Sequence, residues 1–175
     1  MLDFFKTFER ICSGVGLKRT AEDRHWMHSD VTLEIRDKDG NLKHYSVQKN
    51  LRTNVGADFW DAQLFKVATA GATANFIALT TDAAAPAAGD TTLASEETLN
   101  GLARAQAADA HTASASSSVL TKTFTYTGSS SKVIAKVGLF NASSAGTMVL
   151  ETLLTSTGTV NANGDTITVT WTINF

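Results

Sequence analysis

Residues 166–175 read T-I-T-V-T-W-T-I-N-F and alternate without interruption between a small polar and a large apolar side chain. In an extended strand, alternate side chains point to opposite faces of the sheet. One face therefore carries five apolar residues: Ile167, Val169, Trp171, Ile173 and Phe175. A slip by one residue would turn all of them out to the solvent, so the pattern fixes the register. The stretch predicts a β-strand with one buried face.

The same pattern extends back through the C-terminal third of the sequence. Three earlier apolar segments are separated by runs of Gly, Ser and Asn, and they predict strands at residues 122–127, 133–140 and 148–154. Residues 76–80, F-I-A-L-T, predict one more short strand. Strands at this spacing are typical of an antiparallel sandwich or barrel.

A β-hairpin is predicted in the first third of the chain. Residues 31–35 and 44–47 alternate, and the segment between them contains Asp39-Gly40, a pair that favours tight hairpin turns. Residues 50–65 then predict a short helix that begins at Thr53 or Asn54. This helix has an apolar stripe formed by Val55, Phe59, Trp60 and Leu64.

The remaining segments show weaker patterns. Residues 81–92 contain the single proline and predict a loop, and residues 93–102 predict one helical turn. Residues 104–118 are rich in Ala and Ser without periodicity, which indicates a long loop or an extended arm. Together these features predict a mainly β fold: an antiparallel β-sandwich of jelly-roll type with a short N-terminal helix and one further short helix.

The N-terminal helix is predicted from apolar residues at helical spacing within residues 1–11. Charged residues interrupt this stretch, which argues against a secretory signal. A helix of about 12 residues is marginal alone in water, so its apolar face is expected to dock on its own domain or on another chain. The candidate partner-docking residues are Phe4, Phe5, Phe8, Ile11 and Trp26.

Charge is distributed unevenly along the 175 residues. Residues 1–66 contain 11 Lys+Arg and 10 Asp+Glu, whereas residues 67–175 contain only 4 and 7. Charged side chains discourage association, so a poorly charged, Thr-rich β region favours contact with other subunits. We therefore expect a charged docking region at residues 1–66 and a β-sandwich body at residues 67–175, packed together as one unit.

No arrangement of residues predicts catalysis, a cofactor site or a metal site. The single cysteine cannot form an internal disulfide, and His25 and His28 lack further ligands at a suitable spacing. The adjacent Glu96 and Glu97 do not place two carboxylates across a substrate. Asp109 and His111 lie near several serines, but no strained turn presents a nucleophile. We expect a protein that is not an enzyme.

The composition also argues against two kinds of partner. The net charge of −2 gives no basic field for nucleic acid. No apolar run approaches the roughly 20 residues that span a bilayer, so no membrane partner is expected.

Several segments resemble virion proteins of tailed bacteriophages. They are I-A-L-T-T-D-A-A-A-P-A-A-G-D-T-T-L-A-S-E at 77–96, G-L-A-R-A at 101–105, T-F-T-Y-T-G at 123–128, V-G-L-F-N-A at 137–142 and G-D-T-I-T-V-T-W-T-I at 164–173. The resemblance covers residues 76–175. It implies a non-catalytic structural subunit of the neck, collar, tail or fibre-attachment region that forms symmetric homo-oligomers and bridges other virion proteins. It also implies assembly in the cytoplasm of a host bacterium and no small-molecule substrate.

Two alternatives stay open. A capsid decoration or head-fibre protein would share the same β fold. A β-sandwich module that binds carbohydrate or a receptor would instead need exposed aromatic side chains, and Trp26 is the tryptophan that the apolar patterns leave available.

Overall fold

The computed structural model describes residues 28–65 and 72–174, and the predicted N-terminal helix lies outside these ranges. The helix of the described chain is α2 (Asn54–Phe65). The strands are β1 (His28–Arg36), β2 (Leu42–Lys49), β3 (Leu51–Arg52), β4 (Phe76–Thr80), β5 (Ala105–Gln106), β6 (Ala108–His111), β7 (Ser117–Thr125), β8 (Lys132–Phe140), β9 (Met148–Val160) and β10 (Thr166–Asn174).

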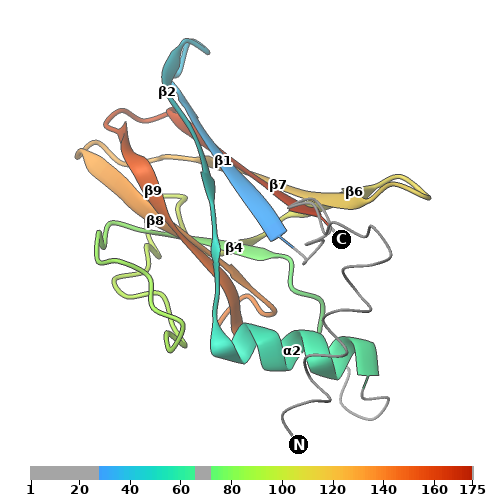
Figure 1. The fold of residues 1–175 in the computed structure, drawn as a ribbon. Helices are drawn as coiled ribbons and strands as arrows, with labels where there is room; N and C mark the ends of the chain where they lie inside the picture. Colours follow the sequence, from blue (N-terminus) through green and yellow to red (C-terminus); the bar gives the residue numbers. More distant parts are fainter. Residues whose placement is uncertain (1–27, 66–71, 175) are drawn as a thin grey trace, which may run out of the picture.

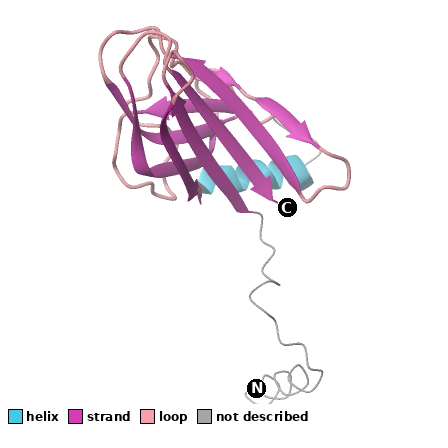
Figure 2. Cartoon of the chain, turned by 90° about the horizontal axis from the view of Figure 1, so that it is seen from above, coloured by secondary structure: helices cyan, strands magenta, loops and turns pink. Residues whose placement is uncertain are grey.

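Two antiparallel sheets of five strands form a β-sandwich, which confirms the predicted fold class (Figure 1). Sheet A has the strand order β2-β1-β10-β7-β6, and sheet B has the order β3-β9-β8-β4-β5. The helix α2 lies across one end of the sheets in both views (Figure 2). Strands from the two ends of the described chain share sheet A, because β1 pairs with β10 along its whole length.

The strand predicted from the final alternation lies at the centre of sheet A. Within β10, Ile167, Val169, Trp171 and Ile173 are buried in the main core, and the threonines between them are half-buried. Strand β1 pairs with β10 in a register that places Leu33 opposite Val169. The apolar side chains of both strands therefore form one wall of the core, as the period of two predicts.

The predicted hairpin is formed by β1 and β2. Its turn is closed by the Asp37 carboxylate, which accepts hydrogen bonds from the backbone N–H groups of Asp39 and Asn41 at 2.9 and 2.8 Å. The hydrogen bonds from the Asn41 side chain and backbone hold the pKa of Asp37 below its ordinary value. Gly40 adopts φ +86°, a conformation that glycine reaches at little cost.

Helix α2 begins after Thr53, whose Oγ1 accepts a hydrogen bond from the Gly56 N–H at 3.0 Å. The predicted start at Thr53 or Asn54 is confirmed, and the preceding residues Leu51 and Arg52 pair with β9 as strand β3. Phe59 and Trp60 pack against the core as the apolar stripe predicts.

Gly56 allows α2 to lie directly against the backbone of β9. A Cβ atom on Gly56 would lie 2.1 Å from the carbonyl oxygen of Val149, and a backbone atom cannot move aside easily. Alanine has a higher helix propensity than glycine by about 1 kcal/mol. We nevertheless expect Gly56→Ala to lower the free energy of unfolding by about 1–3 kcal/mol, measured by urea denaturation. A variant more stable than the unchanged chain would show that this contact does not restrict residue 56.

The segment between β4 and β5 covers the outer face of sheet B. A small second core forms there from Ala78, Leu93, Phe140 and Met148. The helical turn predicted for residues 93–102 is absent, and this part of the segment has only turns and one isolated bridge, between Thr80 and Glu96. Leu93 lies in this second core, and Leu102 lies in the main core.

Asp165 organises the turn between β9 and β10. Its side chain is 1% exposed, and Oδ2 accepts hydrogen bonds from Lys43 Nζ at 2.7 Å and from the N–H groups of Asn161 and Ala162. Burial would raise the pKa of Asp165, but these hydrogen bonds and the Lys43 charge outweigh it and lower the pKa.

We expect the Asp165→Asn variant to lose about 1.5–3 kcal/mol of unfolding free energy at neutral pH, the size of a charged hydrogen bond. Because the folded-state pKa is depressed, the contribution is complete above the unfolded-state pKa and disappears as the pH falls through the folded value. The variant should therefore show a flatter loss of stability on acidification in urea titrations at several pH values. The exposed Asp39→Asn change is the control, with an expected effect under about 0.5 kcal/mol. If the unchanged chain and the Asp165 variant lost stability equally as the pH falls, the proposed role of the Asp165 charge would be wrong.

Candidate functional site

The predicted docking residues Phe4, Phe5, Phe8, Ile11 and Trp26 lie outside the described ranges. Among the described residues, the surfaces that stand out are the two edges of sheet A, a small cavity beside α2 and a buried charge network under the 81–104 segment.

One edge of sheet A lies on a projecting hairpin. Strands β6 and β7 pair over four residues, from Ala108 opposite Thr121 to His111 opposite Ser118, and the whole of β6 is exposed. Figure 1 shows this hairpin reaching out past the neighbouring strands. Residues 104–118 were predicted as a loop or an extended arm, and they form an arm with strand structure. No side chain of β6 is buried, so its sequence has no alternating pattern that would predict a strand.

The opposite edge of sheet A is strand β2, which carries an apolar outer face. Three of its side chains are more than half exposed: Leu42 at 54%, Tyr45 at 56% and Val47 at 52%. Within the described chain, β1 is the strand that pairs with β2 in sheet A, and the other side of β2 lies against β9 of sheet B.

The inner face of β2 is polar and buried. Ser46 and Gln48 are each 7% exposed, and both side chains lack hydrogen-bond partners, as does the Nε2 atom of His44. Buried polar groups without partners destabilise a chain by roughly 1–3 kcal/mol each. The inner face of β2 therefore lowers the stability of the isolated chain.

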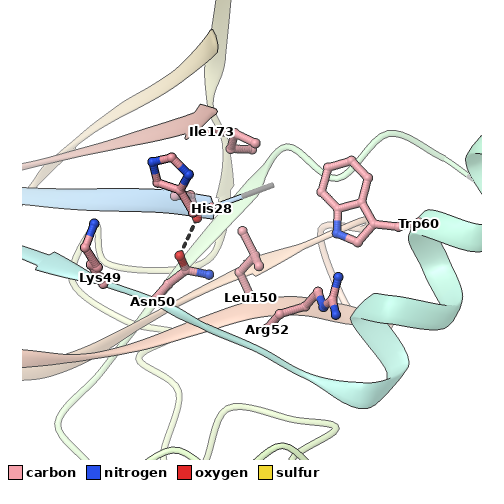
Figure 3. A pocket seen from close by; sticks show the side chains of 8 residues that line it. His28, Lys49, Asn50, Arg52, Trp60, Leu150 and Ile173 are labelled. Carbon is pink, nitrogen blue, oxygen red and sulfur yellow. Dashed lines mark hydrogen bonds between the residues drawn. The ribbon is translucent and has the colours of Figure 1, made fainter. Parts of the chain in front are cut away.

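A cavity of about 160 Å³ lies between the end of β2, β3 and α2 (Figure 3). Leu150, Ile173 and the Trp60 ring form its apolar side, whereas Lys49, Asn50 and Arg52 form its polar side. The Ser29 hydroxyl donates a hydrogen bond to Asn50 Oδ1 in its wall, and it accepts one from Trp171 Nε1 at 3.0 Å. An aromatic wall beside fixed polar groups is a usual form of a small-ligand site.

A second cavity, of about 340 Å³, lies under the 81–94 segment and contains a buried lysine. Lys136 is 3% exposed, and its Nζ lies 2.9 Å from Glu151 Oε1 and 3.0 Å from Asp82 Oδ2. Burial raises the pKa of Glu151, and Asp90 on the covering segment adds to that rise. Burial alone would lower the pKa of Lys136, but its two carboxylate partners raise it. A lysine held protonated in this way ties the segment to sheet B and is a poor nucleophile.

The carboxylates weighed for catalysis are held in ion pairs. Arg104 binds Glu96 with two hydrogen bonds of 2.5 and 2.9 Å, and Lys132 lies 2.9 Å from Glu97. Arg104 also lies over the Phe140 ring at 3.5 Å. These contacts give both glutamates a structural role, which is the anchoring of the 81–104 segment.

The Ser/His/Asp group lies on the exposed arm. Ser118 Oγ donates to Asp109 Oδ1 at 2.6 Å, and His111 Nδ1 lies 2.9 Å from the carbonyl oxygen of Ser117. In a catalytic triad the histidine stands between the serine and the acid. Here the serine bonds to the acid directly, so this geometry does not activate it.

Two further kinds of site find no support in the described residues. No group of three or more His, Cys, Asp or Glu residues there is placed to hold a metal ion. None of the helices in those ranges has the length and apolar character that crossing a membrane requires.

A scan against protein-family models finds no match for this sequence, and a search of curated proteins finds no significant relative.

One of these features has a signal in the sequence that apolar periodicity alone does not detect. Lys136 and Glu151 each interrupt an apolar strand with a charge, and opposite charges in adjacent apolar strands indicate a buried pair. The buried face of β2 could not be predicted, because the alternation favours burial of Tyr45 and Val47, whereas the structure exposes them and buries Ser46 and Gln48.

Proposed function

We propose that this chain is a non-enzymatic structural subunit of a tailed-phage virion, which assembles as a symmetric homo-oligomer and bridges neighbouring proteins at the neck, collar or tail. One observation carries the assembly part: within the described chain, the β6 edge of sheet A is open and lies on a projecting arm (Figure 1). Open edges favour association, and monomeric proteins usually protect them.

The charges of the body support the same proposal. Residues 67–175 contain four basic residues, and three of them, Arg104, Lys132 and Lys136, bind carboxylates of the segment that covers sheet B. These charges are used in ion pairs within the fold and are not free on the surface. The outer surface of the body is therefore even less charged than its composition indicates, as suits a surface covered by other subunits.

The virion part of the proposal rests on the resemblance of residues 76–175. Its most extended motif, residues 77–96, contributes Asp82 and Glu96 to the ion pairs over sheet B, and residues 101–105 contribute Arg104. These shared residues hold the segment that covers sheet B in place. Residues that build the fold do not determine where on the particle a protein lies. Localisation on the particle would therefore distinguish this proposal from its alternative, a capsid decoration protein.

A carbohydrate- or receptor-binding module is the second candidate, because of the cavity beside α2. Trp60 offers an aromatic face there, next to Asn50 and Arg52 as polar groups (Figure 3). Aromatic stacking with a few polar contacts is how such modules bind sugars. A glycan array would favour this candidate if the unchanged chain bound and the Trp60→Ala variant did not, and an array without binding would remove it.

Sedimentation velocity of the full chain, with native mass spectrometry, tests the assembly proposal. We expect one discrete homo-oligomer over a wide concentration range, because a closed symmetric ring has a fixed number of subunits. A monomer at every concentration would overturn the proposal.

A further inference from the structure

We propose that two copies of this chain pair edge to edge through β6, around a two-fold axis that passes between the two copies of Ala110. The inference rests on the proposed function and identifies one contact of the homo-oligomer. Sheet A would then continue from one copy into the other as a single antiparallel sheet.

Strand β6 lacks the features that usually keep an edge strand from pairing. It lies on the projecting arm, and all its side chains are exposed (Figure 1). Natural edge strands are protected by lysine, proline, a β-bulge or a covering segment. The sequence of β6, A-D-A-H, contains neither lysine nor proline, and its register with β7 has no bulge. This edge can therefore accept a further strand.

The pairing with β7 shows which side chains of β6 share a face. Asp109 lies opposite Leu120, which is buried in the main core, so Asp109 is on the inner face of sheet A. His111 shares that face, and Ala108 and Ala110 lie on the outer face, because alternate side chains point to opposite sides. A two-fold axis perpendicular to the sheet keeps the inner faces of both copies on the same side. Inner-face residues of one copy then lie opposite inner-face residues of the other.

Charge selects the register of this antiparallel pair. Because faces must match, the axis passes beside a residue and not between two residues, and the two middle residues of β6 are Asp109 and Ala110. An axis at Asp109 would place two aspartates directly opposite each other. An axis at Ala110 instead places Asp109 opposite His111 of the second copy, at both ends of the contact. Like charges directly opposite are destabilising, whereas opposite charges stabilise a pair of strands, so the axis at Ala110 is favoured.

Contacts within the hairpin already orient the two side chains. Ser118 Oγ donates a hydrogen bond to Asp109 Oδ1 at 2.6 Å, and His111 Nδ1 lies 2.9 Å from the carbonyl oxygen of Ser117. A carboxylate has acceptor sites on both oxygens, so Asp109 can also interact with the imidazole of the second copy. Side chains that are held in place before association lose less entropy when they pair.

Cysteine cross-linking of the full chain tests the register. In a Cys12→Ser background, Ala110→Cys places two thiols at the axis, where opposite Cα atoms are about 4.5–5.5 Å apart and within reach of a disulfide. Ala108→Cys is the matched control on the same face, because its counterpart would lie about 13 Å away along the strands. After mild oxidation, we expect at least about tenfold more disulfide-linked dimer from Ala110→Cys than from the control on a non-reducing gel.

An exchange of charges tests which side chains meet. Asp109→Lys places a lysine opposite a histidine, and His111→Glu places a glutamate opposite an aspartate, so we expect each variant to associate at least about tenfold more weakly. A mixture of the two variants has opposite charges at both positions, and we expect a 1:1 heterodimer. Asp39→Lys makes the same charge change in the exposed hairpin turn and should assemble as the unchanged chain does. Circular dichroism checks that each variant is folded.

Sedimentation velocity of the unchanged chain separates this inference from the proposed function. If the unchanged chain assembles but Ala110→Cys cross-links no better than Ala108→Cys, or if the mixed charge variants form no heterodimer, the β6 contact is wrong and the proposed function stands. If the unchanged chain is a monomer at every concentration, both fail.

Discussion

Trp171→Ala is expected to lower the free energy of unfolding by about 3–5 kcal/mol, the usual effect of removing a large aromatic side chain from a core. Trp171 is 0% exposed and lies in the main core at the centre of sheet A. Its Nε1 also donates a buried hydrogen bond to Ser29. Since small domains have a total stability of about 5–15 kcal/mol, the variant should be close to unfolding at 37 °C.

Trp60→Ala is the matched control for this prediction. Trp60 is partly buried, packs at the edge of the same core and lines the cavity beside α2. We expect its loss to cost about 1–2 kcal/mol, because less apolar area leaves water in the folded chain. Urea denaturation followed by far-ultraviolet circular dichroism measures both, without dependence on tryptophan fluorescence. Equal losses for the two variants would contradict the placement of Trp171 in the core.

Lys136→Met is expected to have the second large effect, again about 3–5 kcal/mol, because it leaves a buried carboxylate without its cation. Glu151 is 1% exposed, and Lys136 is its charged partner at 2.9 Å. The pH dependence follows from the raised pKa of Glu151, which burial causes. A raised folded-state pKa gives a contribution that is present at low pH and is lost as the pH rises. The stability of the variant should therefore fall more steeply than that of the unchanged chain as the pH rises above the ordinary pKa of a glutamate, about 4.3.

A double variant shows whether the effect comes from the unpaired charge. Lys136→Met/Glu151→Leu removes both ends of the buried pair, and we expect it to recover at least about 1 kcal/mol relative to Lys136→Met alone. Lys38→Met is the control at an exposed ion pair, with an expected change under about 0.5 kcal/mol. If the Lys136 and Lys38 variants lost equal free energies of unfolding in urea denaturation, the buried ion pair would not contribute to stability as proposed.

The strands could be predicted wherever one of their faces is buried. Strand β10 follows the alternation of residues 166–175 closely, and the hairpin of β1 and β2 follows from the Asp-Gly turn. Strand β6 could not be predicted in this way, because all its side chains are exposed and backbone pairing leaves no trace in side-chain type. Strand β3, Leu51–Arg52, was not predicted, because a two-residue strand is too short to show a period.

The candidate sites depend on contacts between segments that are distant in the sequence, and the sequence pattern does not show which segments meet. The cavity beside α2 brings together residues as far apart as Asn50 and Ile173. The partners of Lys136 lie 54 residues away at Asp82 and, at Glu151, on the adjacent strand. The charge counts identify residues 67–175 as sparsely charged. The structure was needed to show that three of their four basic residues, Arg104, Lys132 and Lys136, form ion pairs over sheet B.

Labelled particles are the test of the virion function itself. Phage particles purified by density gradient from the bacterium that carries this gene would be analysed by quantitative mass spectrometry and by electron microscopy with antibody against the chain. We expect a fixed number of copies per particle, with label confined to the neck, collar or tail. Particles that lack the chain would contradict a virion function, and label spread over the head would place the chain on the capsid instead.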